Sequence, residues 1–211
     1  MRLIDEILDR QNMILAVKAV KNNKGAAGVD NVTVDELDEY FRKNWNRIKR
    51  EILSKKNKPQ PVRRVYIPKA NGGKRPLGIP TVGDRTIQQA TARKLTEIYD
   101  PTFSKYSHGF RPNRSCHTAM AQVLSYLNEG YEWVIDLDIE KYFDTVDHDK
   151  LISILREKVN DATTLHLIRS YLQAGVMENG LESPTEEGVP QGGPLSLRNP
   201  FTLRATPRCH P

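Results

Sequence analysis

The stretch Val134-Ile-Asp-Leu-Asp-Ile-Glu-Lys-Tyr-Phe-Asp-Thr-Val-Asp-His148 decides the fold of this chain. Its apolar residues, with Trp133 before them, predict a buried strand over 133–139. Asp136 and Asp138 then lie on the same side of that strand, because successive side chains alternate. Burying a carboxylate is costly unless it is paired or bound to a metal, so the strand-end Asp138 is a candidate Mg²⁺ ligand. The spacing supports equally well an interpretation in which these acids cap the following turn and Asp147 and Asp149 are solvated.

Composition is that of a soluble globular protein, with 211 residues, 38% hydrophobic and 27% charged. This length allows one substantial core or two small ones. No apolar run approaches the roughly 20 residues that a membrane span needs, and no apolar signal segment follows Met1. We therefore expect a cytoplasmic protein of bacterial type without contact to a membrane. Cys116 and Cys209 are far apart and lack metal-site spacing, which predicts free thiols.

Positive charge is concentrated in one region. Residues 42–75 hold thirteen Lys or Arg and one acid, Glu51, a local charge of +12 in a chain whose net charge is +6. Most charge runs are solvated surfaces, but this imbalance favours a polyanionic partner. The basic residues expected to bind RNA are Arg42, Lys43, Lys49, Arg50, Lys55, Lys56 and Lys58.

Periodicity predicts separated helices and few strands, an α+β fold. The helices are expected over the first twenty residues, after a capping box at Thr33–Glu36, after caps at Asp84 and Ser115, and over 151–158 and 161–172. The helix after Ser115 is expected to bury Cys116, Met120, Val123 and Leu127. Strands over 62–67 and 74–79 flank an Asn-Gly turn and predict a hairpin, and a shorter hairpin or loop is expected over 181–189.

Two further segments could bind a ligand. The predicted hairpin carries Arg63, Lys69, Lys74 and Arg75 near its glycine-rich tip, where cations and backbone amides could close over a triphosphate. A merely solvated basic hairpin is the alternative. In 190–196, Pro-Gln-Gly-Gly-Pro-Leu-Ser, two glycines would let the backbone approach a ligand, and Gln191 offers both a donor and an acceptor. An ordinary turn explains this segment equally well.

Taken together and in order, these segments resemble the blocks of the group II intron-encoded reverse transcriptase/maturase family. The matching stretches are 22–30, 67–81, 107–119, 134–148 and 188–196. The resemblance implies the fingers and an incomplete palm of a right-hand polymerase, with the thumb absent. It implies an RNA-binding N-terminal extension over 1–60, fingers over 61–130, a partial palm over 131–196 and an aberrant, disordered tail over 197–211.

The resemblance also assigns roles around the opening stretch. Asp138 matches the first metal-binding aspartate, and the backbone carbonyl of Ile139 would be a further metal ligand. Phe143 matches the steric gate, whose ring would clash with a ribose 2′-OH. Asp136 lies outside the motif and keeps a structural role.

Residues outside that stretch acquire roles at the incoming nucleotide. Lys69 and Arg75 match residues that hold the triphosphate, and Arg63 is a third candidate. Gln191 matches the residue beside the nucleotide sugar and the template-primer.

The implied reaction is attack of a primer 3′-OH on the α-phosphate of a dNTP, with two Mg²⁺ ions about 3.5–4 Å apart. The implied partners are group II intron RNA, an RNA template with its DNA primer, and dNTPs; dimer formation is left open. The protein would need chiefly backbone contacts to nucleic acid, because base pairing supplies the sequence specificity.

The resemblance ends at Ser196. The family continues with an apolar helix and a hairpin bearing Tyr-Ala-Asp-Asp, whereas residues 197–211 hold three prolines, three arginines and no acid. We expect that a frameshift or chimeric end produced this tail, and that the polypeptide by itself lacks polymerase activity. Two alternatives stay open: a non-catalytic fragment that binds intron RNA, and an inactive relic whose unfinished palm exposes apolar surface.

Overall fold

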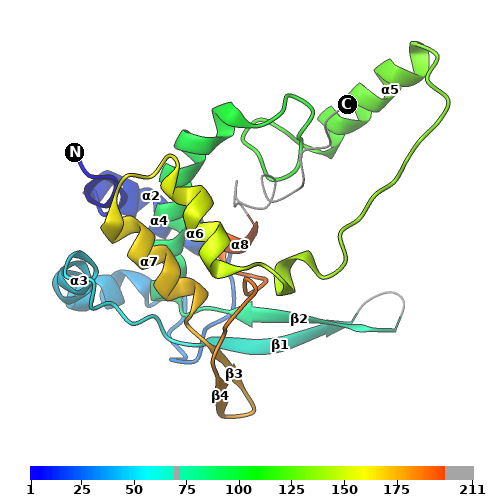
Figure 1. Cartoon of the computed structure of the whole chain (residues 1–211). Helices are drawn as coiled ribbons and strands as arrows, with labels where there is room; N and C mark the ends of the chain where they lie inside the picture. The colour runs from blue at the N-terminus through cyan, green and yellow to red at the C-terminus, as the bar shows by residue number, and fades with distance from the viewer. Residues whose placement is uncertain (69–71, 198–211) are drawn as a thin grey trace.

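The computed structural model describes residues 1–68 and 72–197; Lys69 and the tail 198–211 lie outside the described residues. All the long helices except α5 gather in one body, from which a long β-hairpin projects (Figure 1). The helices are α1 (Leu3–Ile7), α2 (Arg10–Asn22), α3 (Leu37–Leu53), α4 (Val82–Tyr99), α5 (Cys116–Asn128), α6 (His148–Arg156), α7 (Ala162–Leu172) and α8 (Pro194–Leu197), with short 3₁₀ turns η1 (Asp100–Thr102) and η2 (Tyr142–Asp144). The strands are β1 (Val62–Pro68), β2 (Lys74–Ile79), β3 (Val176–Glu178) and β4 (Leu181–Ser183).

Helix α4 is the centre of the body and packs against α1, α2, α3 and α8. It begins one turn earlier than predicted, because the Thr81 hydroxyl, not Asp84, accepts the capping hydrogen bond, from the Asp84 N–H at 3.1 Å. The apolar spacing predicts that Ile87, Thr91, Leu95 and Ile98 face inward; the first three are buried and Ile98 is partly buried. At the other end of α4, the buried Tyr99 hydroxyl donates to the Leu155 carbonyl at 3.0 Å, which fixes α4 to the end of α6.

The N-terminal segment forms two helices instead of the single predicted one. Asp9 interrupts the pattern because its carboxylate accepts hydrogen bonds from the N–H groups of Gln11 and Asn12, at 2.8 and 3.3 Å, and so starts α2. The buried Asn12 amide then donates to the carbonyls of Ile7 and Ala90. This side chain joins α1, α2 and α4.

The capping box expected at Thr33–Glu36 is half formed. The Glu36 carboxylate accepts hydrogen bonds from the Thr33 N–H at 2.9 Å and from its hydroxyl at 2.7 Å. Helix α3 nevertheless starts only at Leu37, with Glu36 as its N-cap. Its buried residues are Leu37, Ile48 and Ile52, which leaves the opposite, basic side of the helix in solvent.

The sheet has the strand order β2-β1-β3-β4. The predicted hairpin is confirmed: β1 and β2 are antiparallel, from Arg63 opposite Ile79 to Pro68 opposite Lys74. Strand β3 pairs in parallel with β1 and forms a second hairpin with β4, a few residues before the predicted position. Of the helices that precede this hairpin, α7 lies within the predicted range 161–172, with Asp161 as its N-cap. Helix α6 starts at His148, three residues earlier than predicted, because Asp147 caps it.

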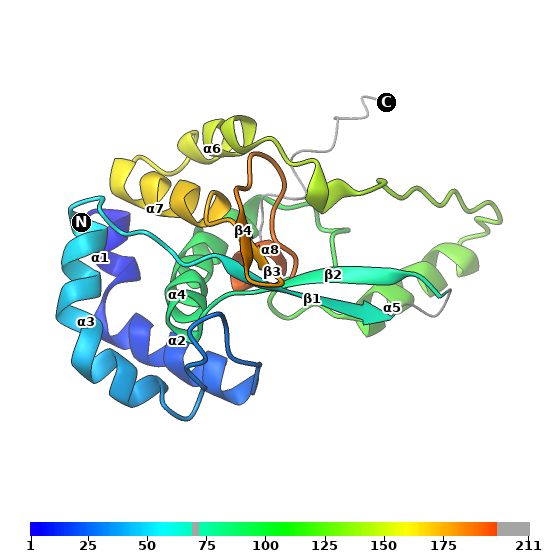
Figure 2. The ribbon, with the colours of Figure 1, turned by 90° about the horizontal axis from the view of Figure 1, so that it is seen from below.

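Helix α5 lies apart from the body in both ribbon views (Figures 1 and 2). Its predicted start is confirmed, since Ser115 forms a capping box with Thr118. Its predicted burial is wrong: Met120, Val123 and Leu127 are exposed, as is Cys116. Helix α5 therefore forms although its apolar face is not packed against another element.

The segment 133–139 is not the buried strand that the sequence predicted. It runs as exposed, irregular chain between α5 and η2, with Trp133 93% and Leu137 88% exposed. A strand is stabilised by the backbone of a neighbour, and the sheet of the described residues consists of β1–β4 alone. Without a neighbouring strand, the apolar pattern of this segment has nothing to pack against.

None of the helices in the described ranges is both long and apolar enough to cross a lipid bilayer.

Candidate nucleotide-binding site

Three segments far apart in the sequence meet beside the base of the β1–β2 hairpin. The Val189 N–H donates to the Phe143 carbonyl at 2.7 Å, and the Gly78 N–H donates to the Gln191 carbonyl at 2.7 Å. The loop around Gln191 therefore connects the η2 turn to strand β2. These two backbone hydrogen bonds bring the predicted steric-gate block and the predicted fingers block to one place.

Arg75 and Gln191 are in direct contact. The Arg75 Nε–H donates to the Gln191 Oε1 at 3.0 Å, and the Arg75 side chain is exposed. Phe143, half-buried in η2, is connected to the same loop because its carbonyl accepts the hydrogen bond from the Val189 N–H. Three of the residues predicted to contact a nucleotide thus surround a single loop.

The glycines of this loop approach protein backbone. Gly192 has φ +122°, and a Cβ built on it would lie 2.7 Å from the Gly78 carbonyl oxygen. A Cβ on Gly193 would lie 2.7 Å from the Gln88 Oε1. The sequence predicted glycines that admit a ligand; in the structure they let the loop seat against β2 and α4.

Arg63 is directed away from the hairpin tip. Its Nη2–H donates to the Ala27 carbonyl at 2.8 Å, and the side chain is half-buried. Arg63 pairs with Ile79 at the base of the hairpin, whereas Arg75 pairs with Ile67, about 13 Å further along the strand at 3.3 Å per residue. Arg63 and Arg75 therefore do not hold one phosphate group together in this structure, and Lys69 lies outside the described residues.

Asp138 and Ile139 are not assembled into a metal site. Both lie in the exposed segment, so the buried carboxylate on which the prediction rested is absent. Among the residues that the structure describes, no group of three or more His, Cys, Asp or Glu is arranged to hold a metal ion. Mg²⁺ favours several oxygen ligands in near-octahedral geometry, and the residues present do not supply them.

The basic surface extends over one side of α3 and the chain after it. All seven residues predicted to bind RNA are exposed: Arg42, Lys43, Lys49, Arg50, Lys55, Lys56 and Lys58. Lys43 forms an ion pair with Glu39 at 2.7 Å. The other six form no ion pair within the described part of the chain, so their charges are available to a polyanion.

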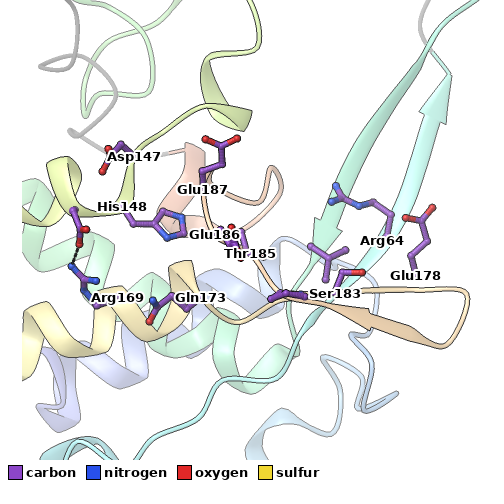
Figure 3. Close-up of a pocket in the computed structure, with 13 residues that line it drawn as sticks. Arg64, Asp147, His148, Arg169, Gln173, Glu178, Ser183, Thr185, Glu186 and Glu187 are labelled. Atoms are coloured by element: carbon purple, nitrogen blue, oxygen red, sulfur yellow. Dashed lines mark hydrogen bonds and ion pairs between the residues drawn. The ribbon is translucent and has the colours of Figure 1, made fainter.

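A cavity of about 880 Å³, absent from the sequence predictions, lies between the strands and the α6–α7 pair (Figure 3). Its acidic lining residues are Asp147, Asp149, Glu178, Glu186 and Glu187, with Arg64 and Arg169 as the basic ones. Arg169 forms an ion pair with Asp149. Spacing could not reveal this cavity, since its wall combines residues from β1, α6, α7 and the β3–β4 hairpin.

His148, also missed in the sequence, lies at the inner wall of this cavity. It is 6% exposed, and its Nε2 is 2.7 Å from the Gly188 carbonyl oxygen. Forty residues separate these partners, so no local pattern could indicate the contact.

An ionisable group is buried where α4 begins. Burial raises the pKa of the Asp84 carboxyl to about 6, against hydrogen bonds that lower it from the Thr81 hydroxyl, the Gln60 N–H and the Tyr171 hydroxyl. Burial, followed by the adjacent Asp84, raises the pKa of Tyr171 well above its usual value. This cluster joins α4, α7 and the chain leading into β1.

Comparison with known proteins identifies the class. The model of the family described as reverse transcriptase (RNA-dependent DNA polymerase) matches residues 67–198. The chain therefore belongs to the reverse transcriptase family. Among solved structures, the partial Cas6-RT-Cas1–Cas2 complex contains a chain with a TM-score of 0.64 and 22% identity, covering 97% of this chain and 34% of that one. This likeness confirms the fold, an α+β arrangement of reverse transcriptase type.

Curated relatives show which kind of reverse transcriptase this chain resembles. The group II intron-encoded protein LtrA of Lactococcus lactis is 41% identical over 196 residues, which are 92% of this chain and 32% of LtrA. The Escherichia coli protein YkfC is 38% identical over 201 residues, 92% of this chain and 53% of YkfC. A putative COX1/OXI3 intron 2 protein of Saccharomyces cerevisiae is 35% identical over 198 residues, 23% of its length. The predicted resemblance to group II intron-encoded proteins is thus confirmed, and this chain spans about a third of LtrA.

Proposed function

We propose that this chain forms the nucleotide-binding side of a group II intron-type reverse transcriptase, which adds dNTPs to a primer on an RNA template. The hydrogen bond between Arg75 and Gln191, in the loop that also binds the Phe143 carbonyl through Val189, carries the proposal. Arg75 offers the donors for a triphosphate, and the Phe143 ring excludes a ribose 2′-OH. Gln191 orients the nucleotide sugar from the loop seated on β2.

Domain roles follow the same proposal. Residues 1–60 form an RNA-binding extension, 61–130 the fingers, 131–196 the beginning of the palm, and 197–211 a tail without a role. The sheet that supports the proposed site contains β1 and β2 from the fingers range and β3 and β4 from the palm range. Fingers and palm would therefore move little relative to each other at this position.

Binding of a fluorescent dNTP tests the nucleotide role. Arg75→Ala should weaken binding at least about tenfold, the effect of removing a charge-assisted hydrogen bond of about 1.5 kcal/mol or more. Arg64→Ala is the matched control, since it removes the same charge from the opposite face of the same hairpin. We expect this control to bind within about twofold of the wild type; equal losses in both variants would reduce the effect to general charge and contradict the proposal.

A second function, binding of structured intron RNA, is favoured by the six exposed and unpaired cations of the basic surface. RNA affinity should fall steeply with salt, because each neutralised phosphate releases counterions. Reversing Lys55, Lys56 and Lys58 to Glu should weaken binding at least about tenfold. The control reverses Lys18, Lys24 and Lys150, which are exposed and lie outside the predicted RNA-binding set, and it changes the net charge equally. Equal losses in the two triple variants would argue against a localised RNA site.

We further propose that the 211-residue polypeptide alone does not polymerise. Its sequence contains no Asp-Asp pair. Among the described residues, Asp138 belongs to no group of three or more side chains that could hold a metal ion. Two divalent ions 3.7 Å apart repel by about 18 kcal/mol at an effective dielectric constant of 20, which one carboxylate cannot offset. We therefore assign no metal-dependent step to this polypeptide. Primer extension on poly(rA) with Mg²⁺ should yield no product; DNA made by the wild type but not by Asp138→Ala would overturn this.

A further inference from the structure

His148 is a buried side chain with a specific hydrogen bond. It is the first residue of α6, and its ring points from this helix toward the segment that contains Thr185 and Glu187 (Figure 3). The Nε2 lies 2.7 Å from the Gly188 carbonyl oxygen. A carbonyl oxygen can only accept, so Nε2 carries the hydrogen and donates it.

The group that His148 binds belongs to a tightly fitted junction, which we define as the pairing of 143–146 with 188–189. The Gly188 N–H donates to the Val146 carbonyl at 2.8 Å, and the Val189 N–H donates to the Phe143 carbonyl at 2.7 Å. Gly188 has φ +83°, and a Cβ on it would lie 2.9 Å from the Asp144 carbonyl oxygen. The junction therefore tolerates little displacement of either segment.

Phe143 and Gln191, two of the three residues proposed to contact a nucleotide, depend on this junction. Phe143 is one of its members, and Gln191 is only two residues beyond Val189. Gln191 is fixed in turn by the Gly78 N–H and by Arg75. A shift of Gly188 would consequently change the position of the Phe143 backbone relative to Gln191.

We propose that His148 is a positioning residue: its Nε2–H hydrogen bond to Gly188 sets the Phe143 turn against the Gln191 loop. The consequence for nucleotides rests on the proposed function, namely that His148 sharpens the choice of deoxyribose over ribose through Phe143. The hydrogen bond itself stands independently of that function. His148 contacts no reacting atom in this scheme.

Two variants separate the hydrogen bond from space-filling. His148→Leu keeps similar volume and loses the donor, whereas His148→Gln keeps an N–H donor at similar reach. Amide hydrogen exchange, followed by NMR on the full 211-residue chain, reports on the junction. In His148→Leu, exchange at Gly188 and Val189 should accelerate at least about tenfold while amides within α4 stay within about twofold. His148→Gln should return the junction amides to within about threefold of the wild type.

Exchange at Gly188 and Val189 that is unchanged in folded His148→Leu would overturn the proposal. If that variant does not fold, the proposal is tested on the wild type, where the ¹⁵N chemical shifts of the His148 ring show which ring nitrogen carries the hydrogen. An Nε2–H form supports the proposal, and an Nδ1–H form alone contradicts it.

Titration with fluorescent dGTP and GTP adds the functional readout. His148→Leu should lower the ratio of the two affinities at least about threefold, and His148→Gln should restore it. If the affinity ratio is unchanged while exchange at Gly188 and Val189 is faster, His148 has a structural role only. That result would overturn the proposal that His148 positions Phe143. If the wild type binds neither nucleotide, the proposed function fails, while the exchange rates still decide whether His148 holds the junction.

Discussion

The helical body (α1–α4, α6 and α7) and the arm (residues 116–139) have similar sequence patterns and opposite environments. Both contain amphipathic helices with well-formed caps, at Asp9 and Asp161 in the body and at Ser115 in the arm. In the body, the apolar stripes form a large buried core and a smaller buried cluster. In the arm, helix α5 buries no residue, and the following segment exposes Trp133 and Leu137.

This difference shows which secondary-structure elements can form from local interactions alone. Caps and helical hydrogen bonds form within a few residues of chain, so α5 forms without a neighbour. A strand takes its hydrogen bonds from another segment, so 133–139 remains irregular where no described strand lies beside it. The residues proposed to contact a nucleotide pack against the sheet and α4, whereas Asp138, the predicted metal ligand, lies in the arm.

The largest contrast is expected from matched leucine deletions. Leu155 is fully buried in the core, so Leu155→Ala should lower the free energy of unfolding by about 2–5 kcal/mol. Leu137→Ala should change it by less than about 0.5 kcal/mol, since this side chain is exposed. Urea unfolding measures both. A loss above about 2 kcal/mol for Leu137→Ala would mean that the arm is packed in solution.

A similar contrast is expected between two aspartates. The Asp161 carboxylate accepts hydrogen bonds from the N–H groups of Ile4 and Thr163 and from the Thr164 hydroxyl. Asp161→Ala removes a helix cap and leaves the buried Ile4 N–H without its partner, which should cost about 2–3 kcal/mol. The control Asp136→Ala, in the arm, should cost less than about 0.5 kcal/mol; a comparable loss there would contradict the exposed placement of 131–140.

Acid should weaken the folded state through the same Asp161. Burial raises its pKa, but the hydrogen bonds from Ile4, Thr164 and Thr163 outweigh burial and hold it below its usual value. The contribution is therefore complete above the unfolded pKa of about 3.9 and is lost as the pH falls through the lower folded value. Urea unfolding between pH 5 and pH 2 should show this loss in the wild type and a smaller one in Asp161→Ala.

Two glycines with left-handed backbone test the junction against the arm. Gly188 has φ +83° with carbonyl oxygens at about 3 Å from a built Cβ, whereas Gly130 has φ +93° with nothing within 4 Å. Gly188→Ala should lose about 2 kcal/mol or more, from backbone strain plus displacement of the junction, and Gly130→Ala about 1 kcal/mol, from strain alone. Equal losses would mean that the junction is looser in solution than in the structure.

The smallest expected effect concerns Asp84. Its folded pKa, about 6, lies above the unfolded value of about 3.9, so burial of the charge costs stability above pH 6. That cost is relieved as the pH falls from 6 to 4, the opposite sign from Asp161. Asp84→Asn should be about 1 kcal/mol more stable than the wild type at pH 8, and this gain should disappear near pH 4. A pH-independent difference in urea unfolding would contradict the raised pKa.

Local signals in the sequence predicted much of the fold. The Asn71-Gly72 turn indicated the β1–β2 hairpin, and Ser115 indicated the start of α5. Asp9 and Thr81 were missed as caps, because each lies inside or before an apolar pattern that continues past it. Burial in the arm could not be predicted correctly. A period-2 pattern indicates which face of a strand is apolar, but it does not indicate whether another element covers that face.

The sequence named candidate site residues, but it did not predict how they are arranged. The family blocks indicated Arg75, Phe143 and Gln191, and the structure brings these three to one loop. Arg63 was predicted to bind the triphosphate because it lies in the basic hairpin. Its guanidinium instead donates to the Ala27 carbonyl, a partner 36 residues away that spacing does not reveal. His148 carried no local signal at all, because its partner Gly188 is defined only by the tertiary fold.

Amide hydrogen exchange of the 211-residue polypeptide tests the central claim most directly, that the nucleotide side is ordered while the strand of Asp138 is not. We predict that amides over 134–139 exchange at rates near those of an unfolded chain, within seconds at neutral pH. Val189 and the amides within α4 should be protected at least about a hundredfold more strongly. Protection over 134–139 as strong as that in α4 would contradict the account, since it would mean that the segment with the predicted metal ligand Asp138 is paired in this polypeptide.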